Sequence, residues 1–165
     1  MEQRVLSILV DNTAGVLSRV AGLFSRRAYN IDSLTVGVTA DPKFSRMTVV
    51  CSGDELILEQ ITNQLTKLVD VRDIKVLADG NCVTRELILV KVMADETNRN
   101  NVISLADIFR AKIVDVAKES LVVELTGNIN KIQAFIDMLD GYEIAELART
   151  GITGLSRGSH DVRYL

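Results

Sequence analysis

The chain has 165 residues, a length that allows one ordinary domain or two small ones. Hydrophobic residues make up 47% of it, which is typical of a globular protein and too high for a disordered one. The formal net charge of −3 argues against a general binder of nucleic acid or of anionic membranes, because such a protein needs a basic surface to displace phosphate counterions.

The N-terminal residues have the pattern of neither a signal peptide nor a membrane span. The acidic residue Glu2 is followed by only a short apolar run, from Val5 to Val10. The two cysteines, Cys51 and Cys82, form no metal-binding motif, and we expect them to be reduced structural thiols. We therefore expect a cytoplasmic protein that does not associate with a membrane.

The predicted elements begin with a strand over residues 4–10, a short apolar run rich in β-branched side chains. A helix is predicted to begin near Ala14, because apolar residues then recur at helical spacing. This stripe, expected to face the core, consists of Leu17, Val20, Ala21, Phe24 and Ala28. Apolar side chains alternate with polar or small ones over residues 34–38, which predicts a half-buried strand.

After a turn at residues 41–43, a second alternating strand is predicted around residues 47–51. Asp54 can cap a second helix, whose apolar face carries Ile57, Leu58, Ile61, Leu65 and Leu68. A strand over residues 71–76 completes a β-α-β-β-α-β unit.

The same order of elements is predicted again after the break at residues 78–81. The four strands are expected near residues 86–93, 112–116, 121–125 and 143–149. The first helix is indicated by Val102, Leu105, Ala106 and Phe109, and the second by Ile132, Phe135, Ile136 and Leu139. The cap of the second helix is either Asn128 or Asn130.

The two halves share the order of their elements but little residue identity, so the repeat is one of architecture. Right-handed crossovers lead such a unit to a ferredoxin-like sheet with its helices on one face. The sequence thus predicts an α+β protein with domains at residues 1–78 and 84–165, joined by a linker at 79–83. The uncovered face and the edge strands need cover, so we expect pairing with another copy or a partner.

The loop between the first strand and the first helix, Asp11 to Gly15, has the features of a carboxylate-binding site. Unpaired N–H groups and the helix dipole favour an anion there, and Gly15 allows a close approach to the backbone. The amide of Asn12 could serve both a carboxylate and an ammonium group. An apolar wall would come from Ala14, Val16 and Leu17. These features predict a site for a small aliphatic α-amino acid; alternatively, Asn12 only caps the helix and Gly15 only relieves crowding.

At these residues the sequence resembles a known family. The stretch DNTAGVLSRVAGLFSRRAYNIDSLTVG, with SRMTVV and LEQITNQLTKLVDV behind it, is similar to an ACT domain. More narrowly, it resembles the small regulatory subunit of acetolactate synthase (acetohydroxyacid synthase). The likeness continues through a second domain that ends in ARTGITGLSRG, and so covers nearly the whole chain.

The resemblance implies a homodimer whose ACT domains pair edge to edge and bind a branched-chain amino acid, usually valine, at the seam. One subunit would contribute Asn12, Ala14, Gly15, Val16 and Leu17, and the second copy would contribute Asn30 and Ile31. It also implies a chain with no catalytic residue, metal or cofactor of its own. Thiamine diphosphate, Mg²⁺ and FAD would belong to the catalytic large subunit, which this chain would activate and make sensitive to feedback inhibition.

The sequence departs from the family pattern at two places. Ala28 stands where the family often has glycine, and Thr13-Ala14 replaces a more usual proline or serine. Alanine at the end of a helix loses the easy left-handed cap, at a cost on the order of 1 kcal/mol. We therefore expect an effect on local stability, and on the pose of Asn30, rather than the loss of the site.

Other interpretations of the sequence are weaker. Gly154 to Gly158 match the G-x-S-x-G pattern of a hydrolase, with His160 nearby, but that chemistry needs a helix after Ser156 for which too little chain remains. Asp70 and Asp73 are interpreted as solvated surface charge. A free-standing amino-acid sensor that regulates another enzyme or transcription is the alternative function, although no basic recognition helix favours contact with DNA.

Overall fold

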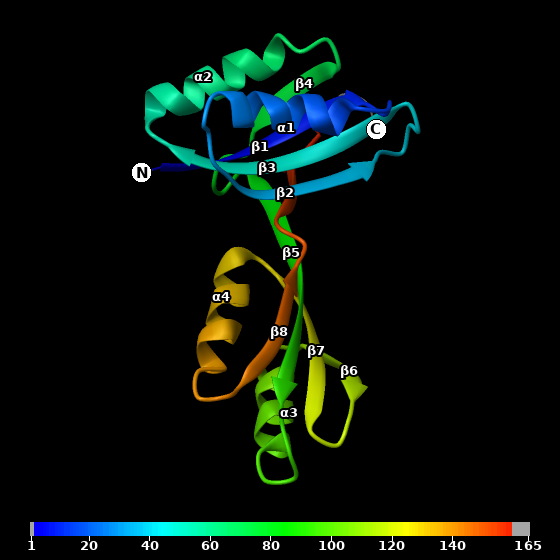
Figure 1. Ribbon diagram of the computed structural model, residues 1–165, viewed down its shortest axis with the longest axis vertical. Coiled ribbons are helices and arrows are strands. Elements are labelled where there is room, and N and C mark those ends of the chain that lie inside the picture. The colour runs from blue at the N-terminus through cyan, green and yellow to red at the C-terminus, as the bar shows by residue number, and fades with distance from the viewer. Residues whose placement is uncertain (1, 160–165) are drawn as a thin grey trace. The chain divides into compact units, whose positions relative to one another are not determined.

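A computed structural model describes residues 2–159 of the chain (Figure 1). The chain divides into two compact units, and each is described here by itself. Of the described residues, the first unit contains 2–83 and 152–159, and the second contains 84–151.

The first unit contains a four-stranded antiparallel sheet with the strand order β2-β3-β1-β4. Its elements, in chain order, are β1 (Glu2–Asp11), α1 (Val16–Arg26), β2 (Ile31–Val38), β3 (Phe44–Gly53), α2 (Glu55–Thr66) and β4 (Val71–Val76). Both helices cover the same face of the sheet (Figure 1). The core between them is aliphatic apart from Phe24, as the scarcity of aromatic residues requires.

The second unit repeats this architecture with the strand order β6-β7-β5-β8. Its elements are β5 (Cys82–Met93), α3 (Arg99–Ile108), β6 (Lys112–Val116), β7 (Ser120–Gly127), α4 (Ile129–Met138) and β8 (Ile144–Arg149). Side chains of both helices share one core with the sheet, where Phe109 and Phe135 meet edge to face with 5.3 Å between ring centroids. The expected α+β fold, two successive βαββαβ repeats, is thus confirmed.

Local capping explains where two of the helices, α2 and α4, begin. Asp54 accepts a hydrogen bond from the amide of Ile57 at 2.9 Å, and Asn128 accepts one from the amide of Lys131 at 2.9 Å. Asp54 therefore caps α2 as expected, and Asn128 rather than Asn130 caps α4.

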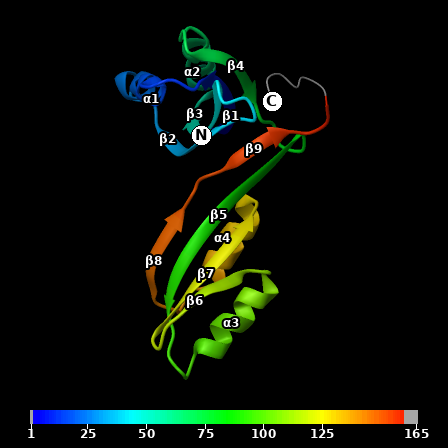
Figure 2. The ribbon, with the colours of Figure 1, turned by 90° about the vertical axis from the view of Figure 1, so that its right-hand side faces the viewer.

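One strand was not predicted. β9 (Thr153–Ser156) pairs with β5, whose first two residues belong to the same unit. Residues from 152 onward were expected in the second domain, yet their described part lies across the open face of the first sheet (Figure 2). Hydrophobic periodicity does not indicate β9, because this strand is four residues long and contains a glycine where a strand usually has a side chain to pack.

No helix among residues 2–159 is long and apolar enough to cross a membrane. The described cysteines are both free, Cys51 buried and Cys82 half-buried, which agrees with the expected reduced thiols. Desolvation by burial raises the pKa of the Cys51 thiol.

Candidate functional site

The loop between β1 and α1, residues 12–15, is shaped by contacts to the turn before β3. The amide N–H of Asn12 donates to the carbonyl of Lys43 at 2.8 Å, and its side-chain Nδ2 donates to the carbonyl of Pro42 at 2.9 Å. Asn12 therefore does not cap α1, which begins at Val16 rather than near Ala14 and has Gly15 at its N-cap. The alternative interpretation, in which Asn12 caps the helix, is therefore wrong.

The first turn of α1 offers backbone donors. The first α-helical hydrogen bond, from an amide to the carbonyl four residues earlier, runs from Arg19 to Gly15 at 3.0 Å. The amides of Leu17 and Ser18 have no such acceptor among the described residues, and α1 has no acidic residue in its first turn. Free N–H groups and the positive end of the helix dipole therefore meet at an exposed position, where an anion is stabilised.

Position 15 favours glycine for two reasons, its backbone conformation and the closeness of the Arg19 side chain. Its φ of +85° lies in the left-handed region that disfavours side chains. A Cβ at this position would lie 2.9 Å from Nη1 of Arg19, so the guanidinium would have to shift. The loop thus keeps the approach to the start of α1 open.

Two bidentate ion pairs hold the base of this loop. Arg19 donates to Asp70 at 2.5 and 3.1 Å, and Arg72 donates to Asp11 through Nε and Nη2, each at 2.7 Å. The amide of Asp11 also donates to the carbonyl of Asp70 at 2.9 Å. Asp70 is only 8% exposed, so its interpretation as a solvated charge was wrong. The hydrogen bond from Arg19 lowers the pKa of Asp70 below its usual value.

The proposed ligand residues of the loop differ in exposure. Asn12, Ala14 and Gly15 are exposed, and Leu17 is 47% exposed, although it was expected to face the core. Val16 instead is only 4% exposed and has its side chain in the core, so it does not form the apolar wall that was expected of it. The reason is the phase of α1: its buried stripe is Val16, Val20, Leu23 and Phe24.

Asn30 and Ile31 lie at the opposite end of α1 from the loop (Figure 1). Asn30 is exposed and donates through Nδ2 to Asp32 at 2.5 Å, while Ile31 packs partly against the core at the start of β2. The 11 residues of α1 extend about 16 Å at 1.5 Å per residue. One chain therefore does not bring the two groups of predicted site residues together.

β2, which begins at Ile31, is an edge strand of the first sheet. Its free edge carries Val36 and Val38, which are among the exposed large apolar side chains of the chain. Unpaired backbone groups beside exposed apolar side chains are typical of a strand that pairs with another chain.

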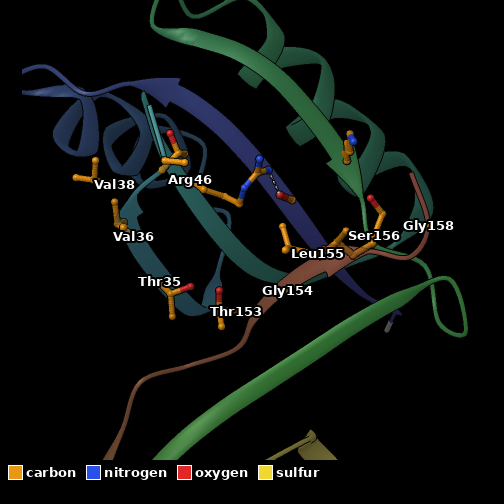
Figure 3. A pocket seen from close by; sticks show the side chains of 15 residues that line it. Thr35, Val36, Val38, Arg46, Thr153, Gly154, Leu155, Ser156 and Gly158 are labelled. Atoms are coloured by element: carbon orange, nitrogen blue, oxygen red, sulfur yellow. Dashed lines mark hydrogen bonds between the residues drawn. The ribbon is translucent and has the colours of Figure 1, made fainter. Parts of the chain in front are cut away.

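The structure also contains a cavity of about 600 Å³ that the sequence did not predict. It lies between the open face of the first sheet and β9, and Figure 3 shows the side chains that line it. Sequence reasoning missed it because β9, which forms one wall, was not predicted.

The hydrolase interpretation finds no support in this region. Ser156 ends β9 and is exposed, and residues 157–159 form bends rather than the helix that a nucleophile elbow requires. His160 lies outside the described residues. Within residues 2–159 no group of three or more His, Cys, Asp or Glu side chains is placed to hold a metal ion.

Two family models match the chain, one in each half. A model described as "AHAS small subunit-like ACT domain" matches residues 6–73, and one described as "Small subunit of acetolactate synthase" matches residues 85–158.

Named relatives are similar over nearly their whole length. A probable acetolactate synthase small subunit of Methanothermobacter thermautotrophicus is 48% identical over 96% of this chain and 95% of its own. The small subunit of acetolactate synthase isozyme 3 of Salmonella typhimurium is 49% identical over 98% of this chain and 99% of its own. Among solved structures, the acetolactate synthase small subunit of Thermotoga maritima is 40% identical, with a TM-score of 0.88, over 96% of this chain and 99% of that one.

Proposed function

This chain belongs to the family of acetolactate synthase small subunits, and from that premise we propose that it is a non-catalytic regulatory subunit. It binds the catalytic large subunit, raises its activity and transmits feedback inhibition by a branched-chain amino acid. The observation that supports the effector site most directly is the loop at residues 12–15 together with the first turn of α1, where the left-handed Gly15, the free amides of Leu17 and Ser18 and the exposed Leu17 side chain lie together.

In this proposal each part of the loop binds one part of the amino acid. The carboxylate accepts hydrogen bonds from the free amides of Leu17 and Ser18 beside Gly15. The side-chain oxygen of Asn12 accepts from the ammonium group, since its Nδ2 is already bonded to Pro42. The hydrocarbon side chain contacts Leu17 and Ala14. Valine, isoleucine and leucine all fit these requirements.

Two copies complete the site. Because Asn30 and Ile31 lie at the far end of α1 from their own loop, they would contribute to the site of a second copy, paired through the free edge of β2. Such a pairing also covers Val36 and Val38. Dimerisation is therefore part of the binding proposal.

The regulatory mechanism is thermodynamic linkage. Valine inhibits the large subunit only if it binds the inhibited arrangement of the complex more tightly than the active one, typically by about 1–3 kcal/mol. Thiamine diphosphate, Mg²⁺ and FAD are expected in the large subunit, and this chain supplies binding and regulation alone.

The test combines the chain with a purified acetolactate synthase large subunit. We expect higher turnover and the appearance of inhibition by valine. If the chain changes neither quantity, the proposal is wrong, and regulation of another enzyme or of transcription becomes the better hypothesis.

Substitutions at Gly15 test the position of the effector site. A carboxylate about 5 Å from that of the ligand costs about 3 kcal/mol at an effective dielectric constant of 20, so Gly15→Asp should weaken valine binding roughly a hundredfold. Gly15→Asn has the same bulk without the charge and should have a smaller effect. Gly22→Asp is the matched control, because it lies on the same helix where an added Cβ meets nothing within 4 Å.

In both Gly15 variants we expect activation of the large subunit to survive. Calorimetry measures valine affinity, and turnover assays measure activation. Unchanged valine affinity in Gly15→Asp would show that this loop does not bind the effector.

A further inference from the structure

The cavity beneath β9 has walls that the fold holds in place. The described residues that line it all belong to the first unit, and they come from the open face of the sheet, from the edge strand β2 and from residues 153–158. Its volume of about 600 Å³ lies within the range of small-molecule sites, roughly 300–1,000 Å³.

Three hydrogen bonds attach the segment around β9 to the rest of the first unit. Thr35 Oγ1 donates to the carbonyl of Ile152 at 3.0 Å, and the amide of Ile152 donates to Ser33 Oγ at 3.3 Å. At the other end, the amide of Arg157 donates to the carbonyl of Asn81 at 2.8 Å. The segment is therefore fixed before and after β9, and the cavity is part of the folded unit.

Arg46 on β3 brings a positive charge into this cavity (Figure 3). Its Nη1 donates to Ser7 Oγ at 2.8 Å, and Ser7 is only 2% exposed, so the guanidinium is oriented by a buried partner. The other nitrogens of Arg46 have no acceptor among the described residues, and none of the described residues that line the cavity is Asp or Glu. An arginine so placed offers donors that fit a carboxylate or a phosphate.

The remaining surface of the cavity is mostly apolar. Leu77 and Leu155 contribute side chains, and Gly37 and Gly154 leave room between the sheet and β9. Lys75 on β4 also lines the cavity, so both charged residues in its described lining, Arg46 and Lys75, are basic. A mostly apolar wall with basic side chains is the arrangement of a site that contacts the apolar part of a ligand and orients it by an anionic group.

We propose that this cavity binds a small organic anion, in which a carboxylate or phosphate group contacts Arg46 and an apolar body lies between the sheet and β9. The site shares no residue with the proposed effector site at residues 12–17 and 30–31. It is a second ligand site on the same sheet and does not depend on the function proposed above.

The test titrates the full chain in a calorimeter with four probes. Hexanoate and hexyl phosphate carry both an anionic group and an apolar body, hexanol lacks the charge, and inorganic phosphate lacks the apolar body. We expect one molecule of hexanoate or hexyl phosphate per chain, bound at least about tenfold more tightly than the other two, because hydrogen bonds to charged groups contribute about 1.5–3 kcal/mol. The tighter of the two anions identifies the preferred group.

Two variants test the site from different sides. Arg46→Met should weaken the preference for hexanoate over hexanol, although Lys75 remains in the lining, while Arg85→Met, on an exposed side chain outside the cavity, should retain it fully. Gly37→Leu should fill the cavity and abolish binding without a clash, because an added Cβ at Gly37 meets nothing within 4 Å and the position shares a strand face with Thr35. The thermal unfolding of each variant shows whether it is folded.

Several results would overturn the proposal. One is hexanoate binding no more tightly than hexanol or inorganic phosphate, and another is unchanged hexanoate binding in a folded Gly37→Leu chain. Competition between hexanoate and saturating valine would show that they share one site, which contradicts a separate cavity site. Since the titration needs neither the large subunit nor valine inhibition, its failure is distinct from a failure of the proposed regulatory function.

Discussion

Two non-glycine residues adopt the left-handed conformation at equivalent places in the two repeats. Ala28 follows α1 and Arg110 follows α3, each with a φ of 56°. Each lies in a Schellman motif: the amide of Tyr29 bonds to the carbonyl of Phe24 at 3.0 Å, and that of Ala111 to Ala106 at 2.8 Å. The sequence departure noted at Ala28 is thus a real local cost, and the second repeat carries the same cost.

Replacing Ala28 should therefore stabilise the first unit. Ala28→Gly removes the steric penalty of the left-handed conformation and should raise the free energy of unfolding by about 1 kcal/mol. Ala21→Gly, in the middle of α1, is the matched control and should lower it by about the same amount. Chemical denaturation measures both; a loss of stability in Ala28→Gly would contradict this account.

A second prediction at this scale concerns pH. The folded state lowers the pKa of Asp70, so its ion pair with Arg19 contributes stability above the unfolded pKa of about 3.9, and that contribution is lost as the pH falls through the folded value. Asp70→Asn should therefore be less stable than the parent at pH 7, and the gap should close in acid.

Asp73→Asn is the comparison for this measurement, because Asp73 makes no ion pair with a described residue. We expect the difference in free energy of unfolding between the parent and Asp70→Asn to be constant above about pH 4 and to shrink steadily as the pH falls to about 2, whereas the difference for Asp73→Asn should change little. A constant gap for Asp70→Asn would mean that the ion pair does not depend on ionised Asp70.

At the scale of elements, the pairing of β5 with β8 contains two ion pairs in different environments. Arg149 donates to Glu86 at 2.8 and 2.9 Å, and the Glu86 side chain is only 3% exposed. Lys91 and Glu146 pair at 3.1 Å on the open face, where both side chains are exposed. The hydrogen bonds that Arg149 donates to the Glu86 carboxylate raise the pKa of Arg149, so the guanidinium stays charged.

Removing one partner should therefore have unequal effects. Arg149→Met leaves a buried carboxylate without its partner and should cost about 3 kcal/mol, whereas Lys91→Met should cost less than about 1 kcal/mol. Urea denaturation of the two variants gives the comparison. Equal losses would indicate that solvent reaches Glu86 after the substitution.

At the scale of the whole molecule, the proposed effector site requires two chains. In a dimer with twofold symmetry, each site takes its loop from one chain and Asn30 from the other. Gly15→Asp and Asn30→Ala then damage both sites of their own dimers. In a mixed dimer, however, both changes fall on one site and the other site is intact.

Mixing the two variants, each defective in valine binding, should therefore restore part of that binding. After exchange of an equal mixture, half of the dimers are mixed and each has one intact site, so about a quarter of the sites of the unchanged protein return. Calorimetric stoichiometry measures this fraction. If valine binding does not recover in a mixture that is shown to exchange subunits, the proposal that each site takes its loop and Asn30 from different chains is wrong.

The sequence by itself determined the order and type of the elements in both repeats. Hydrophobic periodicity, the cap residues Asp54 and Asn128 and the glycine of the first loop are local signals, and they act within a few residues of chain. Predictions failed where a local signal was ambiguous. The apolar residues of α1 fit more than one helical phase, so Leu17 was expected to face the core but is exposed.

Only the tertiary structure decided which distant residues meet. Arg19 contacts Asp70, 51 residues away, and Thr35 contacts Ile152, 117 residues away. Such contacts depend on strand order and register, which local periodicity does not specify. For the same reason, the burial of Asp70 and the cavity at Arg46 appeared only when the sheet was assembled and β9 crossed its open face.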